Sequence, residues 1–134
     1  MIDIQSELFT KIATAVRAQF PGIFVTPEYV SRPPVFPTVC IMEMENTVDR
    51  SYMDSDAVEN CADLMYQVDV YSNRVQGKMD ECRNIAAYVD AQFAHLGFVR
   101  AFMNPIPNLN DATIYRITAR YRAVVDKNKY IYRR

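Results

Sequence analysis

Residues 66–93, YQVDVYSNRVQGKMDECRNIAAYVDAQF, change from the period of a strand to the period of a helix. Tyr66, Val68 and Val70 alternate with Gln67 and Asp69, and this two-residue repeat is typical of a strand. From residue 77 to 96 apolar side chains recur every three or four positions, and Gly97 follows as a helix stop. The stretch predicts a sheet strand that leads into a long covering helix.

The junction YSNRVQG (71–77) carries none of the chemistry that α/β enzymes often hold after a strand. It has no glycine-rich cradle, no paired metal ligands and no nucleophile. The whole chain has three glycines and no GxGxxG, Walker, HExxH, GxSxG or CxxC motif. We therefore assign no catalytic residue, cofactor or metal, and we expect a protein that is not an enzyme.

The flanking sequence supplies the other elements of the fold. Residues 3–20 predict a helix that ends at Pro21-Gly22, and a short edge strand at 23–30 is interrupted by Pro27. The remaining expected strands lie at 38–46, 63–72, 98–103 and 113–125. We expect a loop at 47–62 that could contain hairpin structure, a turn at DKNK (126–129) and a closing strand at YIYRR (130–134). This order predicts one α+β domain over residues 1–134, an antiparallel or mixed sheet with two helices on one face.

Alternation also predicts which face of each strand meets the core. In 38–46 we expect Cys40, Met42 and Met44 to face the core, and Val39, Ile41 and Glu43 to face away. In 113–125 the residues from Tyr115 to Val125 at every second position form the apolar face. The helix stripe contains Met79, Cys82, Ile85 or Ala86, Val89, Phe93 and Leu96.

Composition limits the function classes. Half of the 134 residues are hydrophobic, as in a globular protein. The net charge is −1, so there is no overall basic excess that would favour binding to nucleic acid. Cys40, Cys61 and Cys82 are too widely spaced for a zinc site and too few for a disulfide framework. The start MIDIQSE resembles no signal peptide, and no run reaches the ~20 apolar residues of a membrane span. We expect a soluble protein made in the cytoplasm, with no membrane partner.

Charge is unevenly placed along the chain. The segment 49–63 is acidic and includes Asp54, Asp56 and Glu59, whereas 116–134 is basic. Arg116, Arg120 and Arg122 share one strand face, and Lys127 and Lys129 follow them. These arginines could pair within the chain with Glu43, Glu45 or Asp69, meet carboxylates of a neighbouring subunit, or bind phosphates. We favour pairing, within or between subunits, because the net charge is not positive.

Other titratable groups give weaker signals. His95 lies on the last turn of the second helix, where the helix dipole favours it, so a general base is the less favoured interpretation. DSDAVENCADLM (54–65) lacks the glycine and the third ligand of an EF-hand loop. Glu43 and Glu45, two apart on one predicted strand face, could form a carboxylate pair, but we assign them no catalysis.

Several sequence segments, taken in order, resemble segments of the tail-terminator (tail-completion) proteins of long-tailed bacteriophages. These are PPVFPTVCIMEMEN (33–46), YQVDVYSN (66–73), LGFVR (96–100) and IYRITARYRAVVD (114–126). The resemblance spans about residues 4–132 and implies a structural protein of the virion, located at the tail end or neck. Such a protein forms a ring, usually a hexamer, that stops polymerisation of the tail tube and presents a head–tail joining surface.

The resemblance implies as partners the chain itself, the tail tube protein and head–tail connector proteins. DNA would pass through the ring lumen without sequence-specific contact. The interface or lumen candidates are then the acidic group (Asp54, Asp56, Glu59) and the basic group (Arg116, Arg120, Arg122, Lys127, Lys129). Alternatives are a head–tail adaptor or minor capsid component, and a small α+β domain that binds a ligand or nucleic acid.

Overall fold

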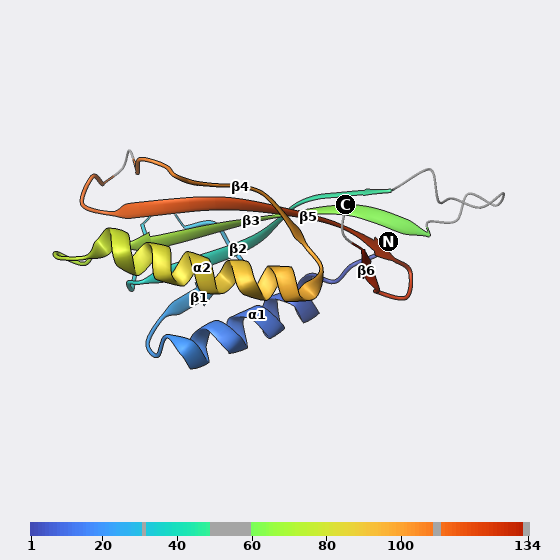
Figure 1. Cartoon of the computed structure of the whole chain (residues 1–134), viewed down its shortest axis with the longest axis horizontal. Helices are drawn as coiled ribbons and strands as arrows, with labels where there is room; N and C mark the ends of the chain where they lie inside the picture. Colours follow the sequence, from blue (N-terminus) through green and yellow to red (C-terminus); the bar gives the residue numbers. More distant parts are fainter. Residues whose placement is uncertain (31, 49–59, 109–110, 133–134) are drawn as a thin grey trace.

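A computed structural model describes residues 1–30, 32–48, 60–108 and 111–132 (Figure 1). In order, the elements are α1 (Gln5–Gln19), β1 (Phe24–Thr26), β2 (Thr38–Val48), β3 (Cys61–Ser72), α2 (Lys78–Leu96), β4 (Val99–Pro105), β5 (Tyr115–Asp126) and β6 (Ile131–Tyr132). The six strands form one sheet in the order β1-β2-β3-β5-β4, with β6 also paired to β5. Only β1 and β2 are parallel among these pairs, so the sheet is mixed and the α+β prediction is confirmed.

Both helices cover the same face of the sheet, as Figure 1 shows. Leu8, Ile12 and Val16 of α1 and the buried residues of α2 pack in one cluster with inward residues of the strands. At its centre the Phe93 ring stacks on the Tyr121 ring, with 4.3 Å between centroids. The helix after the chemically empty junction thus covers the sheet. None of the described helices is long and apolar enough to cross a membrane.

The central strand β3 is buried on both of its faces. Tyr66, Val68 and Val70 face the helices, whereas Gln67, Asp69 and Tyr71 face the opposite side, which we call the open face. On that side Cys40, Tyr71 and Ile114 form a second, smaller cluster. Val30 and Phe36, from the proline-rich connection between β1 and β2, pack against it.

The predicted core face of β2 was wrong. Val39 and Ile41 enter the main cluster beneath the helices, while Cys40 lies in the smaller cluster and Met44 is 45% exposed. Both faces of this strand carry apolar residues, so alternation alone does not tell which one the helices cover. Met79 also departs from its predicted stripe and is 51% exposed.

The region between β2 and β3 was predicted as a loop over 47–62. β2 continues to Val48 and β3 begins at Cys61, and Val48 pairs with Ala62. The two strands are therefore a longer hairpin than expected. Asp54, Asp56 and Glu59, the acidic interface candidates, lie outside the described residues.

Glu43 and Glu45 do not share a strand face. A bulge between them places Glu43 opposite Tyr66 and Glu45 opposite Met65, which are neighbours on β3 and point to opposite sides. The proposed carboxylate pair is therefore wrong, because one extra residue in the strand reverses the alternation.

Gly97 ends α2 in the left-handed region, at φ 99°. The Phe98 N–H donates to the Phe93 carbonyl and the Gly97 N–H donates to the Ala94 carbonyl. These two bonds give hydrogen-bond donors to carbonyls of the last helical turn. A Cβ at Gly97 would lie 3.2 Å from Ile131 Cγ2. This glycine joins the helix to β4 and lets β6 approach the helix end.

We expect Gly97→Ala to lower the free energy of unfolding more than Gly22→Ala. Both positions have positive φ, which costs an alanine roughly 1–2 kcal/mol. Only Gly97 adds a crowded contact, because a Cβ at Gly22 meets nothing within 4 Å. Urea unfolding of the two variants measures the difference, and equal losses would show that the approach of Ile131 is unimportant.

Candidate functional site

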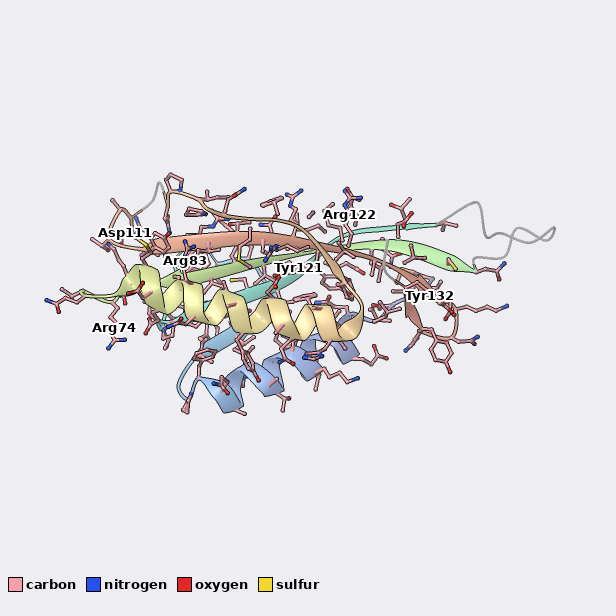
Figure 2. All side chains as sticks on the ribbon, viewed as in Figure 1. Arg74, Arg83, Asp111, Tyr121, Arg122 and Tyr132 are labelled. Atoms are coloured by element: carbon pink, nitrogen blue, oxygen red, sulfur yellow. The ribbon has the colours of Figure 1, made fainter. Side chains whose placement is uncertain are left out.

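The arginine-rich side of β5 lies on the open face. Arg116, Thr118, Arg120 and Arg122 stand there at alternate positions, opposite Tyr71, Asp69, Gln67 and Met65 of β3. Figure 2 shows the side chains of the two strands and labels Arg122. The predicted division of β5 into an apolar and a basic face is correct, but its arginines differ in what they contact.

Asp69 is the centre of this array and is fully buried. Arg116 Nε donates to Asp69 Oδ1 at 3.0 Å, and Arg116 Nη2 forms an ion pair with the same oxygen at 2.9 Å. The Thr118 hydroxyl donates to the same oxygen, and Gln67 Nε2 donates to Oδ2 at 3.1 Å. A buried carboxylate is stable only when paired and hydrogen-bonded in this way.

Arg116 is also held by aromatic rings. Its guanidinium carbon lies 5.9 Å from the Tyr29 ring centroid and 5.7 Å from that of Tyr71, within the range of cation–π contact. Burial lowers the pKa of Arg116, but the charge and hydrogen bonds of Asp69 outweigh burial and raise it. Arg116 is therefore a charged internal partner, and the prediction of pairing within the chain is confirmed for Arg116 with Asp69.

Arg120 extends the same array. Its Nε donates to Gln67 Oε1 at 3.0 Å, and its guanidinium lies 5.8 Å from the centroid of the Phe102 ring of β4. Because Gln67 also donates to Asp69, the two arginines are joined through one amide and one carboxylate. This network ties β3, β4 and β5 together on the side that the helices leave uncovered.

The other basic candidates lie apart from this network. Arg122 is exposed, lies opposite Met65 and Val99, and has no ion pair with any described residue. Lys127 is exposed in the turn after β5, and Lys129 Nζ contacts Glu7 Oε1 of α1 at 2.5 Å. Within the described part of the chain, Arg122 and Lys127 are the candidates that leave a charged group exposed and unpaired.

A second polar cluster, beneath the helices, was not recognised in the sequence. Tyr66 is fully buried, and its hydroxyl has no hydrogen-bond partner among the described atoms; the same is true of Glu43 Oε1. Burial, and then the charge of Asp3, raises the pKa of Glu43. Burial and the Glu43 charge also raise the pKa of Tyr66. The only signal in the sequence was a glutamate in an apolar strand, and Glu43 follows the alternation of Val39 and Ile41 to the helix side.

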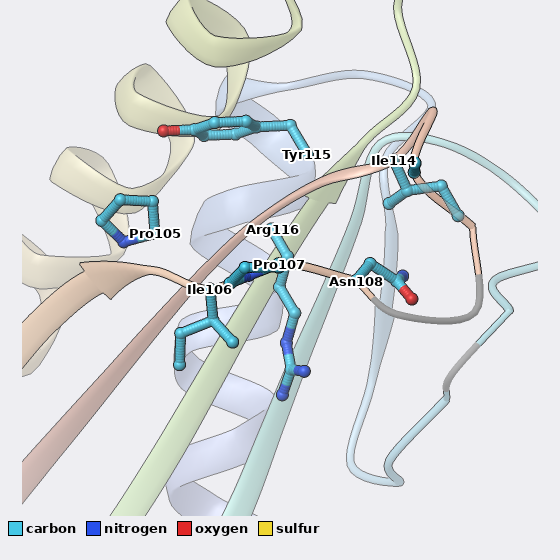
Figure 3. Close-up of a pocket in the computed structure, with 8 residues that line it drawn as sticks. Pro105, Ile106, Pro107, Asn108, Ile114, Tyr115 and Arg116 are labelled. Carbon is cyan, nitrogen blue, oxygen red and sulfur yellow. The ribbon is translucent and has the colours of Figure 1, made fainter.

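A groove of about 600 Å³ lies where β4 ends and β5 begins (Figure 3). Pro105, Ile106, Pro107 and Ile114 give it a mostly apolar wall. Within residues 1–30, 32–48, 60–108 and 111–132, no three His, Cys, Asp or Glu side chains are placed to bind a metal. His95 lies exposed on the last turn of α2, as expected, away from this groove.

The three cysteines are buried and free. Burial raises the pKa of Cys40 to about 11 and that of Cys82 to about 12, so both remain thiols at neutral pH. They act as small core residues, as the sequence predicts for Cys40 and Cys82.

No protein-family model matches this chain, and no curated protein sequence matches it either.

We expect Arg116→Ala to destabilise the protein by about 3–5 kcal/mol, because it leaves the buried Asp69 carboxylate without its cation. Arg122→Ala on the same strand should change stability by less than about 0.5 kcal/mol, since Arg122 is exposed. Denaturant unfolding of both variants gives the comparison. Equal effects would mean that the Asp69 network contributes nothing specific.

We expect Glu43→Gln to raise the melting temperature at pH values above the raised pKa of Glu43. A carboxyl whose pKa is raised by folding binds its proton more tightly in the folded state, so the protein loses stability as pH rises through that pKa. The gain from Glu43→Gln should therefore shrink as pH falls toward the unfolded value of 4.5. Glu45→Gln, exposed on the open face, is the control. A gain independent of pH would contradict this explanation.

Proposed function

We propose that this protein is a structural component of a bacteriophage tail, which caps the tail tube as an oligomeric ring and forms the head–tail joining surface. The ordered resemblance of residues 33–46, 66–73, 96–100 and 114–126 to tail-terminator proteins supports this role. In the structure these segments fall on β2, β3, the end of α2 with the start of β4, and β5 of one α+β domain.

The most direct structural support is the nature of the open face beside Arg122. Val99, directly opposite Arg122, is 39% exposed, and Tyr132, opposite Val124 further along β5, is 52% exposed. Apolar and aromatic side chains beside an arginine are typical of protein–protein interfaces. Enzyme sites, in contrast, are usually concave with converging polar groups. The face therefore favours assembly over catalysis.

Ring closure requires two different patches on each subunit. We propose that Arg122 and Lys127 belong to the basic patch and that Asp54, Asp56 and Glu59 belong to the acidic one. Arg116 and Arg120 have a different role in this proposal, since Asp69 and Gln67 already hold their guanidinium groups. Lys129 already contacts Glu7.

A head–tail adaptor or minor capsid component remains the alternative within the same class, and it differs in its docking partner. Nucleic-acid binding by the arginines is less favoured. Phosphate binding needs guanidinium groups that are free to reach it, and two of the three arginines are engaged within the chain.

The proposal predicts a ring by light scattering after size exclusion and by negative-stain imaging, alone or after mixing with tail tube protein. Added to polymerising tube protein, the chain should limit tube length. Arg122→Glu should weaken assembly about tenfold, because it removes an exposed interfacial charge. Arg83→Glu, exposed on α2, is the matched control.

Tubes that grow to the same length with and without the protein would contradict the terminator role. A protein that binds connector components but not tube would favour the adaptor alternative. Circular dichroism of Arg122→Glu checks that loss of assembly is not loss of fold.

A further inference from the structure

The turn between β3 and α2 displays an apolar side chain that packing within the chain does not explain. Val75, in the junction YSNRVQG, is 96% exposed. Met79, one helical turn later, is 51% exposed. Single exposed apolar residues are common, but one of these precedes α2 and the other lies in its first turn. We call them the apolar knob.

The groove between β4 and β5 offers a matching surface. Its wall contains Pro105, Ile106, Pro107 and Ile114, and its volume of about 600 Å³ exceeds what one side chain fills. Lys78 Nζ donates to the Thr113 carbonyl at 3.2 Å, so the start of α2 lies near the groove. The knob does not enter the groove of its own chain, because Val75 is almost fully exposed.

One pair of opposite charges, Arg74 and Asp111, lies beside the two surfaces. Hydrogen bonds from Thr113 lower the pKa of Asp111, and Arg32 and Lys78 also lie near enough to lower it. The Arg74 side chain, next to Val75, is 67% exposed and makes only a 3.6 Å ion pair with Glu81. Asp111 lies beside the groove residues Ala112 and Ile114, and its Oδ1 accepts the Thr113 N–H and hydroxyl. Asp111 forms no ion pair with any described residue. Figure 2 shows Arg74 and Asp111 toward the same end of the molecule.

We propose that the apolar knob of one copy seats in the groove of a second copy, with Arg74 facing Asp111 of that copy. The knob and the groove are different surfaces, so the knob of each copy can seat in the groove of the next and the contact can repeat from copy to copy, as a ring requires; a reciprocal contact would close a two-fold dimer instead. The inference deepens the proposed function, on which it rests for the ring, by naming one subunit contact. It uses a surface separate from Arg122.

Disulfide trapping between two different variants tests the contact directly. Val75→Cys and Ile106→Cys proteins are mixed under a mild oxidant, and cross-linked dimers are identified by mass. The three native cysteines are buried, so they should not react. We expect dimers between the two variants and few from either variant alone. Arg83→Cys mixed with Ile106→Cys is the matched control, because Arg83 is exposed but lies outside the knob.

Two further variants test how much the knob and Asp111 contribute to the affinity of self-association. Val75→Asp should weaken self-association at least about tenfold, and it should leave the fold intact because the side chain makes almost no internal contact. Asp111→Asn keeps the oxygen that Thr113 uses but removes the charge. It should give a smaller, salt-dependent loss.

The outcomes separate this inference from the proposed function. Rings that cap tubes but show no Val75–Ile106 cross-link, or that tolerate Val75→Asp, would overturn the inference and leave the proposed function standing. The protein could instead show the cross-link between copies but neither form rings nor cap tubes. That result would support the knob contact and overturn the proposed ring. A cross-link from Val75→Cys to tube protein, with none between copies, would also overturn the inference.

Discussion

A buried carboxylate on the central strand constrains the rest of the sheet. Asp69 has no solvent exposure, and its stability requires Arg116, Thr118 and Gln67 at their present positions. Shifting β3 against β5 by one residue would turn Asp69 toward the aromatic core under the helices. The network therefore specifies strand register as well as contributing stability.

The same network covers much of the open face, which carries only the smaller apolar cluster of Cys40, Tyr71 and Ile114. On the helix side, Tyr66, Phe93 and Tyr121 pack with the aliphatic residues of both helices. On the other side, arginine side chains and the proline-rich connection cover β3, and the sheet needs no further layer. Asp69 holds Arg116 and Gln67 holds Arg120 in this network, whereas Arg122 is exposed at its edge.

The two ends of the molecule present different groups to a partner. Arg74 and Asp111 lie toward one end of the molecule, and Tyr132 lies toward the other (Figure 2). Groups that differ between the ends give each subunit two distinct patches, which heterologous assembly into a ring requires.

The sequence by itself determined the element order, both helices, the apolar face of β5 and the Gly97 stop, because these depend on local periodicity and local backbone freedom. It also identified Arg116 as a candidate and Asp69 as one possible partner. Tertiary structure decided which face of β2 meets the helices, since both faces are apolar, and separated Glu43 from Glu45 through one bulge. It also decided that Arg116 is internal while Arg122 is exposed. Three arginines at equal spacing on one strand look alike in sequence, and only the neighbouring strand determines which of them meets a buried carboxylate.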